Sequence, residues 1–531
     1  MACASDDGPS GPAPTLQVTS PERGTVRDHL GTIEVRGQVA PGEAGGAAVE
    51  SVMVNGVPAA LAADGSFTAT IAARPGATLI ETVATDTSGT VATDTRTMLA
   101  GTLITPDALI ADAITAGISA DTFDKMGVMA GNMIAATDVA ALLAPMNPVL
   151  NAGAEEGEDC LWIKGDVEGF EVNQPRINLI PFSGGLRLEA DFFDVYVPVD
   201  ARYAFACVDA RDHLNIRANR VSIAGDLAIS AQNGGLKVDL TNADIDLDGL
   251  DLDATGVPGA VINLFQIESL VEWVFELGVE RFMEPMVNDL MAGIGGVDLE
   301  MDLMGHTLDL SVVPGQIDFD PSGAQVRLDT RFFVQGTESS PGFIFTENSL
   351  PTMSTASGFE MAMADDAANQ LLSGFWAAGA LAISMPVDGG AFDETAVNAM
   401  LPPMLSADPD SGALRLIVGD LGLRFNQGGA TQAEVALNLV MDVTVEPGEK
   451  FLELSLGEPE IHVDVVDGVA NQTGFTDADL EAIIPLVVDH ELHVLTPLIE
   501  AIPVPSIGGV SVVDLGIEGK NGYVTITGAM Q

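Results

Sequence analysis

Two stretches of the 531-residue chain carry side chains with a spacing that metal ions could use. The first, Asp244–Gly249, has an aspartate at every second position and ends in glycine, as a calcium-binding loop begins. Such a loop needs a bidentate glutamate at its twelfth position, where this chain has Thr255. Asp251 and Asp253 continue the period of two, which is typical of one face of a β-strand. We therefore interpret the stretch as the solvent-facing side of a strand rather than as a calcium site.

The second stretch, His490–His493, reads His-Glu-Leu-His. Zinc peptidases place His-Glu-x-x-His on a helix, so that two imidazoles four positions apart reach one metal ion. The spacing here is one residue short, and we predict no metal site. The chain also has no Gly-x-Ser-x-Gly elbow, no glycine-rich phosphate loop and no credible partner for cysteine catalysis. These patterns predict a protein that is not an enzyme and that needs no cofactor.

Three cysteines bear on the compartment in which the protein works. Cys160 and Cys207 both fall in stretches predicted to be strands, and an even pair in an exported chain favours one disulfide bond. Cys3 stands in a Ser-, Gly- and Pro-rich stretch at residues 1–14 that resembles the start of a mature bacterial lipoprotein. We therefore predict an exported protein of the bacterial periplasm or cell surface, anchored to the outer membrane by a lipid on Cys3. The alternative is an N-terminal cysteine that carries no lipid.

The charge of the chain restricts its partners. It has 77 acidic and 21 basic residues, for a net charge of −56 at pH 7. Such a surface repels nucleic acids and anionic lipid headgroups, so neither nucleic acid nor anionic lipopolysaccharide is an expected partner. No stretch reaches the ~18–20 consecutive apolar residues that a membrane-spanning helix needs. Aromatic residues make up only 5% of the chain, so aliphatic side chains, alanine and methionine must fill its core.

Four segments have apolar side chains at the spacing of a helix, and any site would depend on these elements for its position. Residues 262–294 and 476–502 have apolar side chains at steps of three and four, which predicts two long helices that each bury one broad face. Each follows a set of alternating strands, and each set follows a further helical segment, at 104–143 and 359–381. The order helix, strands, long helix, strands therefore occurs twice, which indicates an internal duplication.

A separate pattern of short strands and tight turns precedes this duplicated part. Between residues 15 and 100, apolar and polar residues alternate in short runs, with turn signals such as Asn55-Gly56 and Asp64-Gly65. Several strands of this size in ~85 residues predict a β-sandwich. The run resembles bacterial immunoglobulin-like modules, which act as spacers or as adhesive surfaces. Of these two roles we favour the spacer.

The order of the elements after residue 100 resembles the tubular lipid-binding (TULIP) family of bactericidal/permeability-increasing protein, lipopolysaccharide-binding protein and cholesteryl ester transfer protein. Three places carry the resemblance. Residues 262–294 are similar to the long helix of the first barrel in that family, residues 358–381 to the helix that opens the second barrel, and residues 485–528 to the last helix and the closing strands. The resemblance covers residues 101–531.

The resemblance implies an α+β fold with two tandem antiparallel barrels, each wrapped on a long helix in a boomerang-shaped body, preceded by an all-β immunoglobulin-like sandwich. The expected boundaries are a tether at residues 1–14, the sandwich at 15–100, a first lipid-binding barrel at 101–345 and a second at 346–531. Relatives that capture lipopolysaccharide use a cationic barrel tip, whereas the arginines here are spread among acidic residues. This departure argues against lipopolysaccharide and leaves open a neutral or zwitterionic lipid or a sterol-like guest.

The expected function is therefore non-enzymatic binding or transfer of a phospholipid or another hydrophobic ligand, whose acyl chains would lie in apolar barrel pockets. Shielding such chains from water is favourable by ~0.8 kcal/mol per methylene. The residues expected to line the pockets are Ile110, Ile114, Met129, Leu264, Ile267, Val271, Val274, Phe359, Met363, Leu371, Ile484, Val487 and Val488. Any one of them could equally be packed core. The alternative function is an adhesion or scaffolding surface lipoprotein that carries no lipid.

Overall fold

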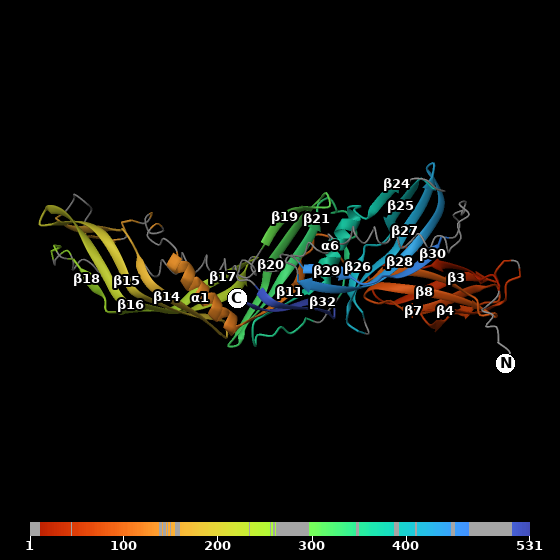
Figure 1. Ribbon diagram of the computed structural model, residues 1–531, viewed down its shortest axis with the longest axis horizontal. Coiled ribbons are helices and arrows are strands. Elements are labelled where there is room, and N and C mark those ends of the chain that lie inside the picture. The colour runs from red at the N-terminus through yellow and green to blue at the C-terminus, as the bar shows by residue number, and fades with distance from the viewer. Residues whose placement is uncertain are drawn as a thin grey trace, which may run out of the picture.

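The computed structural model shows an elongated molecule made mostly of antiparallel sheets (Figure 1). The residues it describes are 11–43, 45–136, 141, 145, 147–148, 150–153, 160–232, 234–254, 256–258, 261, 297–346, 350–386, 392–408, 411–447, 452–466 and 512–530.

The N-terminal residues form an immunoglobulin-like sandwich of two sheets. The first sheet contains β1 (Thr15–Ser20), β3 (Thr32–Ala40), β7 (Ser66–Ala72) and β6 (Ala60–Leu61). The second contains β2 (Thr25–Arg27), β9 (Val91–Ala100), β8 (Gly76–Asp86), β4 (Val49–Val54) and β5 (Val57–Pro58). Alternation in β3 sends Ile33 and Val35 into the core, where they meet Val54 of the second sheet. The period-two pattern of the sequence therefore becomes the buried face of this sandwich.

The sheet farthest from the sandwich is called here the distal sheet (Figure 1). Its strands are β12 (Leu150–Gly153), β13 (Leu161–Val167), β14 (Glu171–Phe182), β15 (Gly185–Phe205), β16 (Val208–Gln232), β17 (Gly235–Asp248) and β18 (Asp251–Asp253). Helix α1 (Ala120–Ala136) packs on β14. Gly127 permits this close approach, because a Cβ there would lie 2.4 Å from the carbonyl oxygen of Ile177. The aspartates of residues 244–248 are exposed along β17, so the interpretation of this stretch as a strand face is confirmed.

A central sheet joins the two halves of the chain. Its order is β19 (Val297–Leu303), β20 (His306–Asp320), β21 (Gly323–Val334), β11 (Ile110–Ser119), β23 (Phe359–Ala364), β32 (Tyr523–Met530) and β31 (Val512–Lys520). A short pair, β10 (Thr102–Ile104) with β22 (Phe343–Phe345), lies apart from it. Because β11 pairs with β23, strands more than 200 residues apart in the chain share one sheet.

The proximal sheet is named for its place beside the sandwich (Figure 1). It contains β24 (Ala382–Pro386), β25 (Glu394–Ala399), β26 (Met404–Ala407), β27 (Leu414–Gln427), β28 (Ala430–Pro447), β29 (Leu452–Leu456) and β30 (Glu460–Val465). Helix α6 (Asp365–Ala377) packs between this sheet and β21 and β22. One apolar core cluster runs from the distal sheet through the central sheet to the proximal sheet. The order strand, helix, lateral sheet and central-sheet strands occurs twice, first from β11 and then from β23.

The predicted α+β class, with two barrels each wrapped on a long helix, is wrong. Of the described residues 66% lie in strands and 8% in helices, and the helices with bounds there are α1 and α6. The segments at 104–143 and 359–381 contain the central strands β11 and β23, which are buried on both faces over much of their length. Such strands are continuously apolar, and periodicity alone does not separate them from a buried helix. The predicted long helices at 262–294 and 476–502 lie outside the described residues.

Candidate ligand pocket beside Trp376

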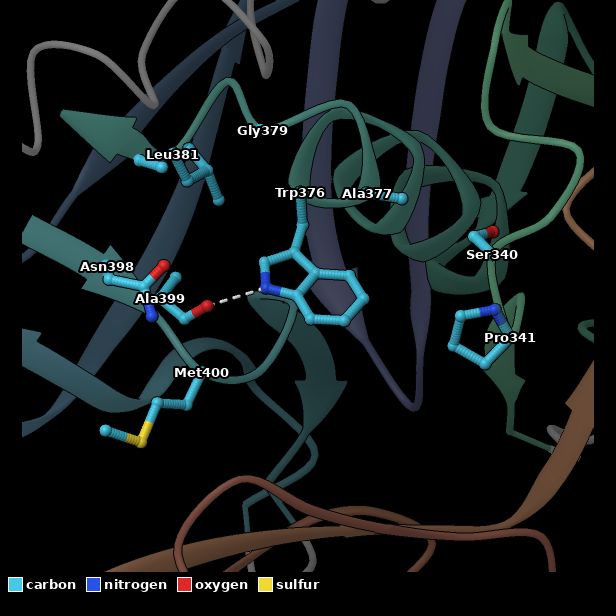
Figure 2. Close-up of a pocket in the computed structure, with 10 residues that line it drawn as sticks. Ser340, Pro341, Trp376, Ala377, Gly379, Leu381, Asn398, Ala399 and Met400 are labelled. Atoms are coloured by element: carbon cyan, nitrogen blue, oxygen red, sulfur yellow. Dashed lines mark hydrogen bonds between the residues drawn. The ribbon is translucent and has the colours of Figure 1, made fainter.

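A pocket of about 420 Å³ opens where the end of α6 meets the edge of the proximal sheet. Trp376 lies between the loop that carries Pro341 and the strand end at Ala399 and Met400 (Figure 2). The ten residues that line the pocket are Ser340, Pro341, Trp376, Ala377, Gly379, Leu381, Ala382, Asn398, Ala399 and Met400. Three separate segments of the chain therefore build one pocket.

The end of α6 places Trp376 at this pocket. The helix ends at Ala377 with Ala378 as its C-cap, and Gly379 follows with a φ of +82°, a left-handed conformation that glycine adopts without strain. Gly374 lets the helix approach β21, because a Cβ there would lie 2.8 Å from Cγ2 of Val334. The last turn of α6 is thus held against the central sheet, and the chain reverses directly into β24.

The indole ring presents mostly apolar surface to the pocket. Its Nε1 donates a hydrogen bond to the carbonyl oxygen of Ala399 at 2.8 Å, as the dashed line in Figure 2 shows. Because that donor is already paired, the rest of the ring can contact hydrocarbon without leaving a buried polar group unsatisfied. Among the ten lining residues none is charged, and Ser340 and Asn398 supply the polar side chains. This arrangement can hold an apolar group and offer it a few hydrogen bonds at the rim.

Buried polar side chains fasten α6 in place. Asn369 exchanges two hydrogen bonds with the backbone of Leu405, at 2.7 and 2.8 Å. Gln370 accepts from the backbone N–H of Phe332 at 2.7 Å and donates to two carbonyl oxygens of the β10–β11 connection. Burial raises the pKa of Asp366 to about 6. The sequence analysis missed these contacts, although polar residues inside an otherwise apolar segment were a visible signal of them.

The described residues that were expected to line lipid pockets lie away from this site. Ile110 is buried in a small cluster with Phe343, and Phe359, Met363 and Leu371 are buried in the main core. Ile114 and Met129 are partly buried and pack against that same core. The remaining predicted residues lie outside the described residues: Leu264, Ile267, Val271, Val274, Ile484, Val487, Val488 and the proposed anchor Cys3.

Cys160 and Cys207 form a disulfide bond, with Cα atoms 4.1 Å apart. Cys160 immediately precedes β13, and Cys207 lies in the turn between β15 and β16, so neither is within a strand. The bond ties the start of β13 to a turn at the end of the long β15–β16 hairpin.

Two other classes of site are not found in the described part of the chain. There, no three His, Cys, Asp or Glu side chains gather closely enough to hold a metal ion. The His490–His493 stretch lies outside that part. Neither described helix combines the length and the apolar character needed to span a bilayer.

Comparisons with known proteins match a family model at the N-terminal end and solved structures of low identity over most of the chain. A family model described as glucodextranase, domain B, matches residues 14–101, which form the immunoglobulin-like sandwich. No curated protein matches the chain. The crystal structure of lipopolysaccharide binding protein is 15% identical, with a TM-score of 0.41, over 79% of this chain and 99% of that one. The structure of P47 of Clostridium botulinum E1 is 13% identical, with a TM-score of 0.27, over 80% and 100%. Similarity at this level assigns neither a function nor residue roles.

Proposed function

We propose that this protein is an exported, non-enzymatic binding or transfer protein for a phospholipid or another hydrophobic ligand. The observation that carries the proposal is the uncharged pocket beside Trp376, whose wall combines the indole ring with aliphatic side chains. Its volume of about 420 Å³ lies within the range of ~300–1,000 Å³ typical of small-molecule sites. The pocket is therefore large enough for part of an acyl chain.

The energetics of such binding are favourable. Burial of roughly six methylenes against Trp376, Leu381 and Met400 would contribute about 5 kcal/mol, at ~0.8 kcal/mol for each. A polar headgroup would remain at the rim, where Ser340 and Asn398 offer hydrogen bonds. The guest is neutral or zwitterionic in this proposal, because the pocket has no cation for an anionic headgroup and the whole chain has a net charge of −56.

Membrane attachment completes the proposal. A lipid on Cys3 would hold the protein at the bacterial outer membrane, on its periplasmic side or at the cell surface, near a source of hydrophobic guests. Nucleic acids and anionic lipopolysaccharide are not partners in this account, since the acidic surface repels both.

The test compares a filled pocket with an open one. Ala382 is exposed at the pocket rim, so the phenyl ring of Ala382→Phe should occupy the space of the guest. The control is Ser384→Phe, which adds the same ring two residues along the same face of β24 but outside the pocket. We expect organic extraction and native mass spectrometry of the purified protein to detect a bound lipid. Fluorescent phosphatidylcholine should bind to wild type and Ser384→Phe, and at least about tenfold more weakly to Ala382→Phe. Absence of both extracted lipid and probe binding in the wild type would refute the proposal.

A scaffolding or adhesion protein is the second candidate. The observation that favours it is the dense packing of Phe359, Met363 and Leu371, which were expected to contact a guest and instead fill the main core. The same experiment separates the two candidates, because a scaffold would neither retain lipid during purification nor respond to Ala382→Phe.

A further inference from the structure

The immunoglobulin-like sandwich is fastened to the proximal sheet by buried charges. The guanidinium of Arg23, in the β1–β2 loop, lies 3.0 Å from a carboxylate oxygen of Asp420 and 3.3 Å from carboxylate oxygens of Asp94 and Asp464. The side chains of Asp420 and Asp464 are 0% and 7% exposed. A buried ion pair of this kind is costly to break on one side only, because the remaining charges have no water to replace their partner. Arg23 therefore holds the two parts of the molecule together.

Hydrogen bonds fix the orientation of this contact. The backbone N–H of Thr95 donates to Asp464 at 3.0 Å, and Thr97 Oγ1 donates to Asn438 Oδ1 at 2.7 Å. Asn438 Nδ2 donates in turn to the carbonyl oxygen of Thr95 at 2.8 Å. Gly419 leaves room for this approach, because a Cβ there would lie 2.4 Å from Cβ of Thr97. The sandwich is thus docked in one register rather than tethered loosely.

The segment at residues 400–404, which connects β25 to β26, lies between this interface and the ligand pocket. On one side, Met400 lines the pocket. On the other, Leu401 and Met404 pack with Ala77 and Leu99 of the sandwich in a separate apolar cluster. This segment is therefore a wall of the pocket and a part of the docking interface.

The Arg23-Gly24 turn of the sandwich touches this wall directly. A Cβ on Gly24 would lie 3.2 Å from Cβ of Met400, and Gly24 has a φ of +73°. The backbone N–H of Gly24 donates to Asp420 at 2.9 Å, while the N–H of Met400 donates to the carbonyl oxygen of Asp420 at 3.3 Å. Asp420 thus connects this turn to the segment at residues 400–404. Figure 2 draws Met400 toward the side of the pocket where the red-brown ribbon of the sandwich passes.

We propose that the docked sandwich sets the position of the Met400 wall, so that guest affinity depends on docking and both respond to pH through the Arg23 cluster. This inference rests on the proposed function of the pocket. It makes the sandwich a regulatory part of the binding site rather than a simple spacer.

The charges of the cluster explain its response to pH. Asp94 and Arg96 come from β9, Arg23 from the β1–β2 loop, Asp420 from β27 and Asp464 from β30, while β28 contributes the neutral Asn438. Three carboxylates face two guanidinium groups, which leaves one excess negative charge in a buried interface. His462, two residues before Asp464 on β30, lies 3.3 Å from Glu460 and adds no ion pair to the cluster in the described residues.

The direction of the response follows from burial. Desolvation raises the pKa of Asp464 to about 6 and also raises the pKa of Asp420. In this proposal the desolvation of Asp464 comes from docking, so release of the sandwich would expose its carboxyl group to water and return its pKa toward the ordinary value. The docked state then binds the proton more tightly, and docking strengthens as the pH falls through about 6. At higher pH the one carboxylate charge that the two guanidinium groups do not compensate weakens docking, although the Arg23 ion pairs remain. Guest affinity should therefore be higher at pH 5 than at pH 7.5.

The experiment uses the full-length chain and three variants. Arg23→Met should release the sandwich, Asp464→Asn should mimic the protonated state, and Arg36→Met removes an exposed ion pair with Glu34 of the same sandwich as a control. Hydrogen exchange of residues 95–97 reports docking, and exchange of residues 394–408 reports the pocket wall without any guest. Binding of fluorescent phosphatidylcholine is measured at pH 5 and pH 7.5.

We expect wild type and Arg36→Met to bind the probe at least about fivefold more tightly at pH 5 than at pH 7.5. Asp464→Asn should bind tightly at both pH values. Arg23→Met should bind weakly at both and lose protection in residues 394–408. If Arg23→Met does not fold, loss of the pH response in Asp464→Asn still supports the inference, and its retention still overturns it.

Two results would overturn the inference. One is a released sandwich in Arg23→Met with unchanged protection of residues 394–408 and unchanged probe binding. The other is an Asp464→Asn variant that keeps the wild-type pH response. If wild type binds no probe at all but Arg23→Met still exposes residues 394–408, the proposed function fails and the coupling between docking and the pocket wall stands.

Discussion

Asn369 fastens α6 to the segment that follows the pocket, and its removal tests whether this polar contact positions Trp376. Asn369 Oδ1 accepts from the N–H of Leu405 at 2.7 Å, and its Nδ2 donates to the carbonyl oxygen of Leu405 at 2.8 Å. The residue is 2% exposed, so Asn369→Ala would leave two buried backbone groups without partners. At about 1–3 kcal/mol for each group, we expect the free energy of unfolding to fall by about 2–6 kcal/mol.

Urea unfolding followed by circular dichroism would measure this loss. Because the chain contains several sheets that can unfold in separate steps, hydrogen exchange of residues 365–377 should be measured alongside to localise the effect. Asn132→Ala, at an exposed position of α1, is the matched control and should change the stability by no more than about 0.5 kcal/mol. If Asn369→Ala and Asn132→Ala unfold at the same urea concentration and α6 stays equally protected, then Asn369 does not hold the helix that carries Trp376.

Three further outcomes are expected. Burial raises the pKa of Asp366 to about 6, and a carboxyl group with a raised pKa destabilises the folded state while it is charged, so the stability of the protein should rise as the pH falls from about 7 to about 4. Thermal unfolding of Asp366→Asn across this pH range should show a smaller rise in stability. An unchanged rise in this variant would assign the pH dependence to other groups. The Cys160–Cys207 bond joins residues 47 positions apart, so replacing both cysteines with alanine should lower the free energy of unfolding by about 4 kcal/mol in chemical denaturation. Equal stability of the oxidised wild type and the double variant would contradict this prediction. Gly374→Ala would bring a methyl group within 2.8 Å of Cγ2 of Val334 and should destabilise the protein by about 1–3 kcal/mol in the same assay. Adding Val334→Ala to this variant should restore part of the lost stability. A Gly374→Ala protein as stable as wild type would show that α6 has room to move.

The local features of the chain could be predicted from the sequence. Alternation along residues 33–39 and 244–248 follows the two-residue period of a strand, and the structure has β3 and β17 there. The immunoglobulin-like sandwich could be predicted for the same reason, because strands such as β3 and β7 alternate between exposed and buried residues. The twofold occurrence of the element order was also visible, although its first elements were assigned to the wrong secondary structure.

The errors arose where burial erased the pattern. β11 and β23 lie in the middle of the central sheet, and both of their faces are covered over much of their length. A strand in that position has no polar face, so its sequence has no period of two and resembles a buried helix. Helices α1 and α6 follow these strands directly, which made each pair of elements look like one long helical segment.

The sequence by itself determined which residues are strand-forming, that the chain is strongly acidic, and that an immunoglobulin-like sandwich precedes a duplicated body. Only the tertiary structure decided where a ligand could bind, because the pocket combines Pro341, Trp376 and Met400 from three separate segments. Only the tertiary structure also decided the ion pair of Arg23 and Asp420, which are 397 residues apart in the chain although a guanidinium nitrogen of one lies 3.0 Å from a carboxylate oxygen of the other. Local spacing is encoded by the geometry of a single strand or helix, whereas pockets and buried ion pairs depend on which elements the folded sheets bring together.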